Sequence, residues 1–290
     1  NRFMERLQRG QILVLDGATG TNLQRRGLPG GTPSDTWVMD RPEAVSQLHR
    51  DFLDAGADIL LTNTFGSARP HLEHAGFSGR FEQTNRRAVE LAAQVAAGKE
   101  VLIAGSMGPL GEMLQPYGTL EEAAAEQAYA EQARLLGEAG VDLLVIETQF
   151  DLNEAKAAVR GACSATSLPV VCSFSYDRGT RTMMGVKPSQ AAAELAHSGI
   201  VALGINCGRS LEDNFKALQE LRQATDLPIW FKPNAGLPHQ DDQGRLVYDV
   251  TPEMMADQVP QWIAAGARLV GGCCGTSPEH LKAIAQAVRA

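Results

Sequence analysis

Residues 139–148 read AGVDLLVIET and combine the features from which we predict the fold. Ala139-Gly140 is typical of a helix end, because glycine readily adopts the left-handed conformation that follows a last helical turn. The near-continuous apolar run at 143–146 is typical of a parallel strand that is buried on both faces. Glu147-Thr148 then places polar side chains at the carboxyl end of that strand. The stretch therefore predicts one unit of an α/β protein in which helices and parallel strands alternate.

The same unit recurs on both sides of this stretch, as an apolar run, a polar or glycine-containing loop and an amphipathic segment. The apolar runs are residues 11–15, 58–63, 101–105, 142–147, 169–174, 201–206, 228–232 and 268–272. The predicted helices begin near Pro42, Gly79, Thr119, Leu152, Lys187, Leu211, Thr251 and Ser277. Eight units predict a closed (β/α)₈ TIM barrel that takes residues 1–290 as a single domain. A doubly wound open sheet is the alternative, but it would have fewer strands and a glycine-rich turn after the first one.

Charge and composition exclude several classes of protein. The net charge is −8 and no basic run occurs, which argues against a nucleic-acid or anionic-membrane surface. No stretch of eighteen apolar residues is present, so we expect no membrane span. Five cysteines are an odd number, which argues against a disulfide framework and favours a reducing cytoplasm. The chain does not begin with methionine, and we expect a trimmed chain or one module of a longer protein.

Three of the five cysteines follow predicted strands. Cys207 follows the sixth strand, and Cys273-Cys274 follow the eighth, so all three are expected at one rim of the barrel. Three thiolates that leave one position open are the ligand set of a reactive zinc site. Gly271, Gly272 and Gly275 would let the chain turn sharply enough for both vicinal cysteines to reach one ion.

Other interpretations of the cysteines and histidines stay open at this point. A vicinal pair is also compatible with a redox switch or with chance. Cys163 and Cys172 are interpreted as small buried apolar residues. His280 is expected at the surface of the last helix, and His49 is expected to pack against its neighbours.

The chemistry of three thiolates favours a thiol substrate. A coordinated thiol is deprotonated outright, and a site rich in thiolates keeps the bound sulfur nucleophilic for alkyl transfer. An amino-acid substrate would also need partners for its charged ends. Glu147 and Asp16 are candidates for the ammonium group, although Asp16 is alternatively a turn residue before Gly17. The backbone N–H groups of Gly17, Ala18 and the 105–108 loop, supported by Ser106, are candidates for the carboxylate.

Asn206-Cys207 and residues 271–276 (GGCCGT) together resemble the homocysteine S-methyltransferase family. The resemblance extends over most of the chain, through the motifs LDGATGT at 15–21, TNTF at 62–65, GP at 108–109, IET at 146–148 and PNAGLP at 233–238. It implies a (β/α)₈ barrel, zinc on Cys207, Cys273 and Cys274, and methylation of L-homocysteine to methionine. It further implies that homocysteine binds through Asp16, Gly17, Glu147 and the loop near Ser106, with its sulfur on zinc.

Within the family, the segments after the second, fourth and seventh strands look most like the homocysteine-binding module of cobalamin-dependent methionine synthase. That likeness implies methylcobalamin as the methyl donor, carried by another domain or protein. Betaine- and S-methylmethionine-dependent enzymes are the alternatives. Aromatic residues are only 6%, and Glu147 is followed by Thr148, so an aromatic cage for a quaternary ammonium is not expected. We expect Asn234 to occupy the fourth zinc position before homocysteine arrives.

Three further hypotheses remain. Residues 271–275 and the capped helix after them fit an anion site for a phosphorylated substrate, but that reading leaves the cysteines unexplained. A non-catalytic zinc- or thiol-binding barrel would use the same three cysteines. Methyl transfer to a different thiol would use the same chemistry.

Overall fold

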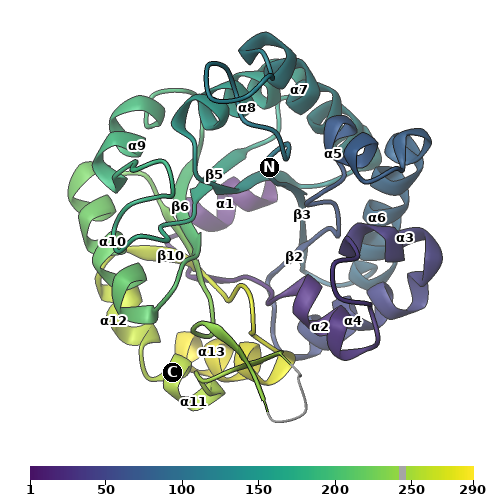
Figure 1. Ribbon diagram of the computed structural model, residues 1–290. Coiled ribbons are helices and arrows are strands. Elements are labelled where there is room, and N and C mark those ends of the chain that lie inside the picture. Colours follow the sequence, from purple (N-terminus) through teal and green to yellow (C-terminus); the bar gives the residue numbers. More distant parts are fainter. Residues whose placement is uncertain (242–245) are drawn as a thin grey trace.

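Eight parallel strands form a ring in the computed structural model, which describes residues 1–241 and 246–290 (Figure 1). The strands are β1 (Leu13–Val14), β2 (Ile59–Leu61), β3 (Leu102–Met107), β4 (Leu143–Gln149), β5 (Val170–Phe174), β6 (Ala202–Cys207), β7 (Ile229–Pro233) and β10 (Ala267–Val270). Their order in the sheet is β1-β10-β7-β6-β5-β4-β3-β2, and a parallel bridge between Leu15 and Ile59 joins its two edges. The predicted (β/α)₈ barrel is therefore confirmed, and each strand coincides with one predicted apolar run.

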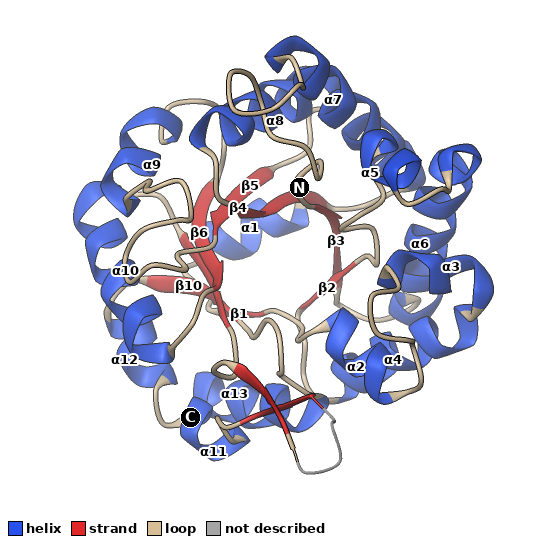
Figure 2. Ribbon diagram, in the orientation of Figure 1, coloured by secondary structure: helices blue, strands red, loops and turns tan. Residues whose placement is uncertain are grey.

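Helices form the outer layer and cover the ring on all sides (Figure 2). The covering helices are α4 (Pro42–Asp54), α6 (Phe81–Ala96), α7 (Glu122–Ala139), α8 (Leu152–Ala165), α9 (Pro188–Leu195), α10 (Leu211–Ala224), the pair α11 (Pro252–Ala256) and α12 (Val259–Ala264), and α13 (Pro278–Arg289). Gly140 follows α7 with φ 102°, and Gly56 and Gly266 follow α4 and α12 with similar values, as the Ala-Gly pairs predict. Each of these turns leads directly into the next strand.

Two predictions about the helices were wrong. The helix predicted to begin near Thr119 begins instead at Glu122, after the N-cap residue Glu121. His280 is not at the surface: only 8% of it is exposed. Its Nδ1 accepts a hydrogen bond from the Ser277 N–H at 3.2 Å, and its Nε2 lies 2.8 Å from the Val250 carbonyl. A capping box at the start of α13 therefore holds this histidine away from the cysteines.

Short elements between the main ones were not predicted. They are α1 (Arg2–Gln8), α2 (Thr19–Arg25), η1 (Ser34–Thr36), α3 (Trp37–Asp40), α5 (Arg69–His74), η2 (Ser78–Arg80) and the antiparallel pair β8 (Pro238–Gln240) and β9 (Leu246–Tyr248). Most of these lie in the long loops that follow β1, β2 and β7.

The amino end of the barrel is closed by α1, which lies behind the ring in Figure 1. The Asn1 side chain caps this helix by accepting from the Phe3 N–H at 2.9 Å. Phe3 is fully buried among the apolar residues that fill the barrel interior, including Leu143 and Trp230. Arg6 donates to Asp58 at 2.6 Å, just before β2. A packed, covered floor therefore leaves only the carboxyl ends of the strands open to a ligand.

Cys172 and His49 are buried as predicted, whereas Cys163 is only partly buried. Cys172 is fully buried within β5, and Cys163 on α8 packs against the same core. His49 on α4 is also buried. Among the described residues, no helix has the length and apolar character that crossing a membrane requires.

Candidate active site

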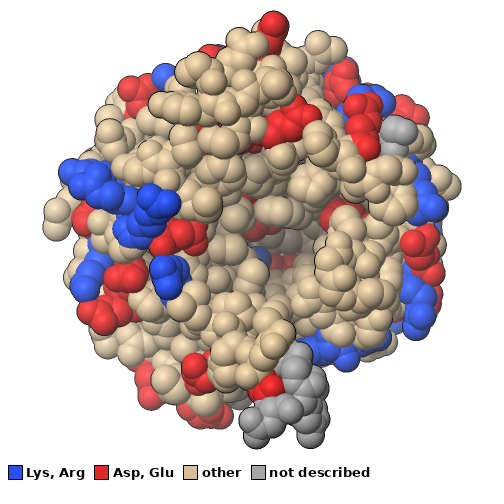
Figure 3. All heavy atoms as spheres, viewed as in Figure 1, with Lys and Arg blue, Asp and Glu red and all other residues tan. Residues whose placement is uncertain are grey.

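A cavity of about 350 Å³ opens at the carboxyl ends of the strands. Figure 3 shows a hollow at the centre of this face, with charged side chains lying mostly on the surrounding helices. The cavity is lined by Asp16, Gly17, Ala18, Thr19, Gly20, Thr21, Ser34, Leu61, Thr62, Asn63, Phe65, Ser106, Glu147, Thr148, Cys207, Lys232, Cys273 and Cys274. All the predicted site residues except Asn234 therefore line one cavity.

Three sulfur atoms form one wall. The Sγ atoms of Cys207, Cys273 and Cys274 all lie within 4.8 Å of one another, and those of Cys207 and Cys273 are 3.1 Å apart. Cys207 ends β6, whereas the other two follow β10, and β7 lies between these strands. Gly275 has φ 84°, so the turn after the vicinal pair uses a conformation that glycine adopts readily. The structure therefore brings together the three cysteines that the sequence singled out.

The cysteine cluster fits a zinc ion. A tetrahedral ion with Zn–S bonds of about 2.3 Å holds its sulfurs roughly 3.8 Å apart, which lies within the span of these distances. Among the described residues, no other group of three or more His, Cys, Asp or Glu side chains is close enough to hold a metal. The three cysteines supply three soft ligands, and a fourth coordination position of the ion would face the cavity.

Each of these thiols affects the ionisation of the other two. Contacts with Cys273 and Cys274, and then burial, raise the pKa of Cys207 well above its usual value. Contacts with Cys207 and Cys273 lower the pKa of Cys274 well below the usual value. Protonated neighbours thus stabilise one thiolate, and ionising all three requires a positive charge among them.

Asn206 lies between two residues with uncommon backbone conformations and bonds one of them. Thr148 and Cys207 have φ values of 63° and 60°, which are uncommon for residues other than glycine. Asn206 Oδ1 accepts from the Thr148 N–H at 2.9 Å, and its Nδ2 donates to Thr148 Oγ1 at 2.7 Å. Asn206 is fully buried, and Ser173 donates to the same Oδ1 at 2.7 Å. The asparagine therefore ties the end of β4 to the end of β6, beside the first cysteine.

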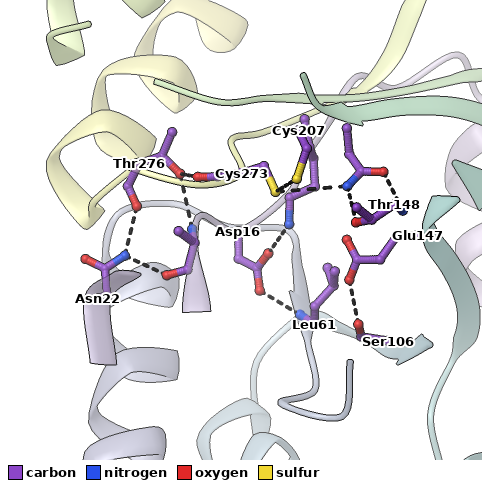
Figure 4. Close-up of polar contacts among 12 residues, drawn as sticks. Asp16, Asn22, Leu61, Ser106, Glu147, Thr148, Cys207, Cys273 and Thr276 are labelled. Atoms are coloured by element: carbon purple, nitrogen blue, oxygen red, sulfur yellow. Dashed lines mark hydrogen bonds and ion pairs between the residues drawn. The ribbon is translucent and has the colours of Figure 1, made fainter. Parts of the chain in front are cut away.

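Glu147 and Ser106 form the wall opposite the sulfurs. Ser106 Oγ donates to Glu147 Oε1 at 2.5 Å, and both side chains are buried (Figure 4). Burial raises the pKa of Glu147 to about 7, although Lys232 opposes this shift. Of the described residues, only Ser106 donates a hydrogen bond to Glu147, so the carboxylate retains acceptor capacity toward the cavity.

Asp16 and Lys232 form a buried ion pair in the cavity wall. Lys232 Nζ donates to Asp16 Oδ1 at 2.7 Å, and Asp16 Oδ2 accepts from the Leu61 N–H at 2.7 Å. The two side chains are 3% and 2% exposed. The sequence analysis missed Lys232. The available signal was a single lysine at the end of the apolar run at 228–232.

Gly17 and Ala18 follow β1 and lie against the cysteine loop. A Cβ atom on Gly17 would stand 2.6 Å from the Phe52 ring, so only glycine fits. The Ala18 N–H donates to Thr276 Oγ1 at 3.1 Å, and Asn22 donates to the carbonyls of Ala18 and Thr276 (Figure 4). The Ala18 N–H that we predicted to hold a substrate carboxylate thus already has a partner. The first turn of α2, Thr19 to Thr21, also lines this side of the cavity.

Asn234 follows β7 beside the end of β6 and does not line the cavity. Its backbone N–H donates to the Cys207 carbonyl at 3.1 Å, and its Nδ2 donates to the Gly208 carbonyl at 2.8 Å. Its Oδ1 is buried and has no hydrogen-bond partner among residues 1–241 and 246–290. An unpaired buried oxygen is costly unless something binds it, so the predicted ligand role is compatible with this geometry.

Comparison with known proteins gives a consistent picture. The sequence model of the family described as homocysteine S-methyltransferase matches residues 13–288. Methionine synthase of Mycobacterium tuberculosis is 31% identical over 96% of this chain, and that of Mycobacterium leprae is also 31% identical. The chain spans about a quarter of the length of these relatives.

Among solved structures, the metallated form of the homocysteine methyltransferase MmuM from Escherichia coli superposes with a TM-score of 0.83. It is 29% identical, and the match covers 99% of each chain. Dihydrodipicolinate synthase DapA-2 of Bacillus anthracis, at 12% identity and a TM-score of 0.52, shares the barrel fold alone.

Proposed function

The chain belongs to the homocysteine S-methyltransferase family, and from that premise we propose that it methylates L-homocysteine to methionine in the cavity described above. The observation that carries the proposal is the placement of Cys207, Cys273 and Cys274 across one cavity from Glu147. An amino acid that reacts at its thiol needs one group of residues that binds its sulfur and another that binds its ammonium group.

The cysteines would hold zinc, which supplies a Lewis acid that keeps a substrate thiol deprotonated at neutral pH. The metallated form of the E. coli relative supports this part of the proposal. Asn206 holds Thr148 in its uncommon conformation, and Asn214 and Asn234 donate to the Cys207 carbonyl, so the ligand wall is preorganised before substrate enters. Asn234 Oδ1 is our candidate for the fourth ligand in the absence of substrate.

The amino-acid end of homocysteine would bind on the opposite wall. Glu147 accepts from the substrate ammonium with its free lone pairs while Ser106 fixes one carboxylate oxygen. Asp16 has lone pairs left beyond those that Lys232 and Leu61 use, and it accepts from the same ammonium. Backbone N–H groups at Gly17 and the first turn of α2 bind the carboxylate, because such groups lack partners within the helix.

For the methyl donor we propose methylcobalamin carried by another domain or protein. Two observations support a large donor. The chain spans about a quarter of the methionine synthases that it matches, and large apolar side chains are exposed in loops after β3, β5 and β7. These side chains are Tyr117, Met183, Met184 and Leu237. The structural likeness to the E. coli homocysteine methyltransferase, at a TM-score of 0.83, favours the second candidate, a small donor such as S-methylmethionine.

Turnover assays test both halves of the proposal. Zinc-loaded protein is incubated with L-homocysteine and, separately, methylcobalamin, S-methylmethionine or betaine, and methionine is measured. We expect methionine from methylcobalamin, its loss in Cys207→Ala, and its retention in the control Cys163→Ala. Turnover with only a small donor would overturn the donor assignment. No methionine from any donor would favour the non-catalytic thiol-binding alternative.

A further inference from the structure

Lys232 is a charged residue in an unusual place. Among the described residues, it is the only buried lysine or arginine, at 3% exposure. It stands near the end of β7, which lies between the two strands that carry the cysteines. Burying an ammonium group costs several kcal/mol unless anions surround it, so its position calls for an explanation.

Anionic groups surround this ammonium group on several sides. Asp16 after β1 is 2.7 Å away. Glu147 on β4 and Cys273 after β10 line the same cavity as Lys232. The Asp16 carboxylate at 2.7 Å stabilises the charged form of Lys232. It has three N–H donors, of which Asp16 takes one.

The charges that the proposed function brings into the cavity are mostly negative. Three thiolates with zinc carry a net charge of −1, and a homocysteine thiolate makes it −2. Asp16 adds a further negative charge, as does Glu147 when it is ionised. Such a concentration of negative charge opposes the arrival of another thiolate unless a fixed cation lies nearby.

We propose that Lys232 positions Asp16 and supplies the fixed positive charge with which the cavity accepts homocysteine as a thiolate. This inference rests on the proposed function and assigns a part of it to a positioning residue in the cavity wall. It predicts that Lys232 matters more for a ligand with a thiol than for the same ligand without one.

Binding measurements separate this role from a structural one. Isothermal titration of the zinc-loaded protein gives the affinity for L-homocysteine and, by competition, for L-2-aminobutyrate, which lacks the thiol. We expect Lys232→Met to weaken homocysteine binding by about tenfold or more and the thiol-free analogue by roughly threefold or less. Lys232→Arg retains the charge and should restore most of the homocysteine affinity. Lys216→Met, at an exposed pair with Glu212, is the matched control and should change neither affinity.

A second variant guards against misfolding. Lys232→Met leaves Asp16 buried without its cation, whereas the double variant Asp16→Asn/Lys232→Met replaces the pair with neutral residues. If Lys232 acts only by holding Asp16, then Lys232→Met and the double variant weaken the binding of homocysteine and of L-2-aminobutyrate by the same factor. That result would refute the charge role. Unchanged homocysteine affinity in Lys232→Met would refute the whole inference. If the wild-type protein binds no homocysteine, the proposed function fails first, and that outcome is distinct from either result.

Discussion

The two ends of the barrel are built from the same eight strands but in opposite ways. At the amino end, α1 covers a floor of apolar side chains, in which Phe3 is fully buried and Leu143 begins β4. Near the carboxyl end, β4 carries Glu147 and the strained Thr148. The floor is packed with apolar side chains, whereas the mouth holds buried charges and uncommon backbone conformations. Stability and function are thus expected to separate along the barrel axis.

The largest predicted effect belongs to the mouth. Cys273→Ser should lower kcat/KM for homocysteine by about a thousandfold or more, because two cysteines cannot hold the metal in a soft-ligand site. Bound zinc, measured by metal analysis, should fall well below one per chain. The free energy of unfolding of the metal-free protein should change by less than about 1 kcal/mol. If the Cys273→Ser variant retained zinc and activity, the claim that the mouth of the barrel carries the metal site would be contradicted.

The floor should show the opposite pattern. Phe3→Ala removes a buried aromatic ring and should lower the free energy of unfolding by about 3 kcal/mol or more, as measured with urea. At temperatures where the variant stays folded, kcat/KM should match that of the wild type. A large loss of activity without loss of stability would show that the floor and the mouth are coupled.

Glu147→Gln tests the wall opposite the sulfurs. The neutral amide cannot form a charged pair with the substrate ammonium, so we expect kcat/KM to fall by about a hundredfold while zinc content stays at the wild-type level. Loss of zinc together with activity would instead indicate that Glu147 supports the metal site.

The same variant has a signature in pH. Burial raises the pKa of Glu147 from 4.5 to about 7. Between these values the folded protein holds a proton that the unfolded chain has released, so this group makes stability fall as pH rises. Above pH 7 the penalty is constant and on the order of 3 kcal/mol. In metal-free protein, Glu147→Gln should therefore gain stability relative to the wild type between pH 5 and 8, and an unchanged difference across this range would contradict the assignment.

A pair of glycines gives the smallest and most closely matched effects. Gly140 at the floor and Gly275 at the mouth both have positive φ, but only Gly275 is crowded, with a Cβ atom there meeting the Tyr248 ring at 2.4 Å. Gly140→Ala should cost about 1–2 kcal/mol of stability and leave homocysteine binding unchanged. Gly275→Ala should cost at least as much and also weaken homocysteine binding several-fold, since it displaces either Tyr248 or the cysteine loop. Equal effects on binding would remove the distinction between the two ends.

Much of the barrel could be predicted because its strands are buried on both faces and therefore appear as uninterrupted apolar runs. The three cysteines could be located because the strands end at one rim. Periodicity does not reveal contacts between distant segments, and this is why Lys232 appeared to be only the end of a strand. The hydrogen bond from Asn206 to Thr148 joins residues that are 58 positions apart in the sequence. The hairpin of β8 and β9 lies inside a long loop with no regular pattern.

Zinc-edge X-ray absorption of the reduced protein, with and without L-homocysteine, tests the central claim most directly. We predict one zinc per chain with three sulfur ligands and one lighter ligand, changing to four sulfurs when homocysteine is added. The absence of zinc, or a coordination shell that homocysteine leaves unchanged, would contradict the proposal that the cysteine wall at the mouth binds the substrate thiol.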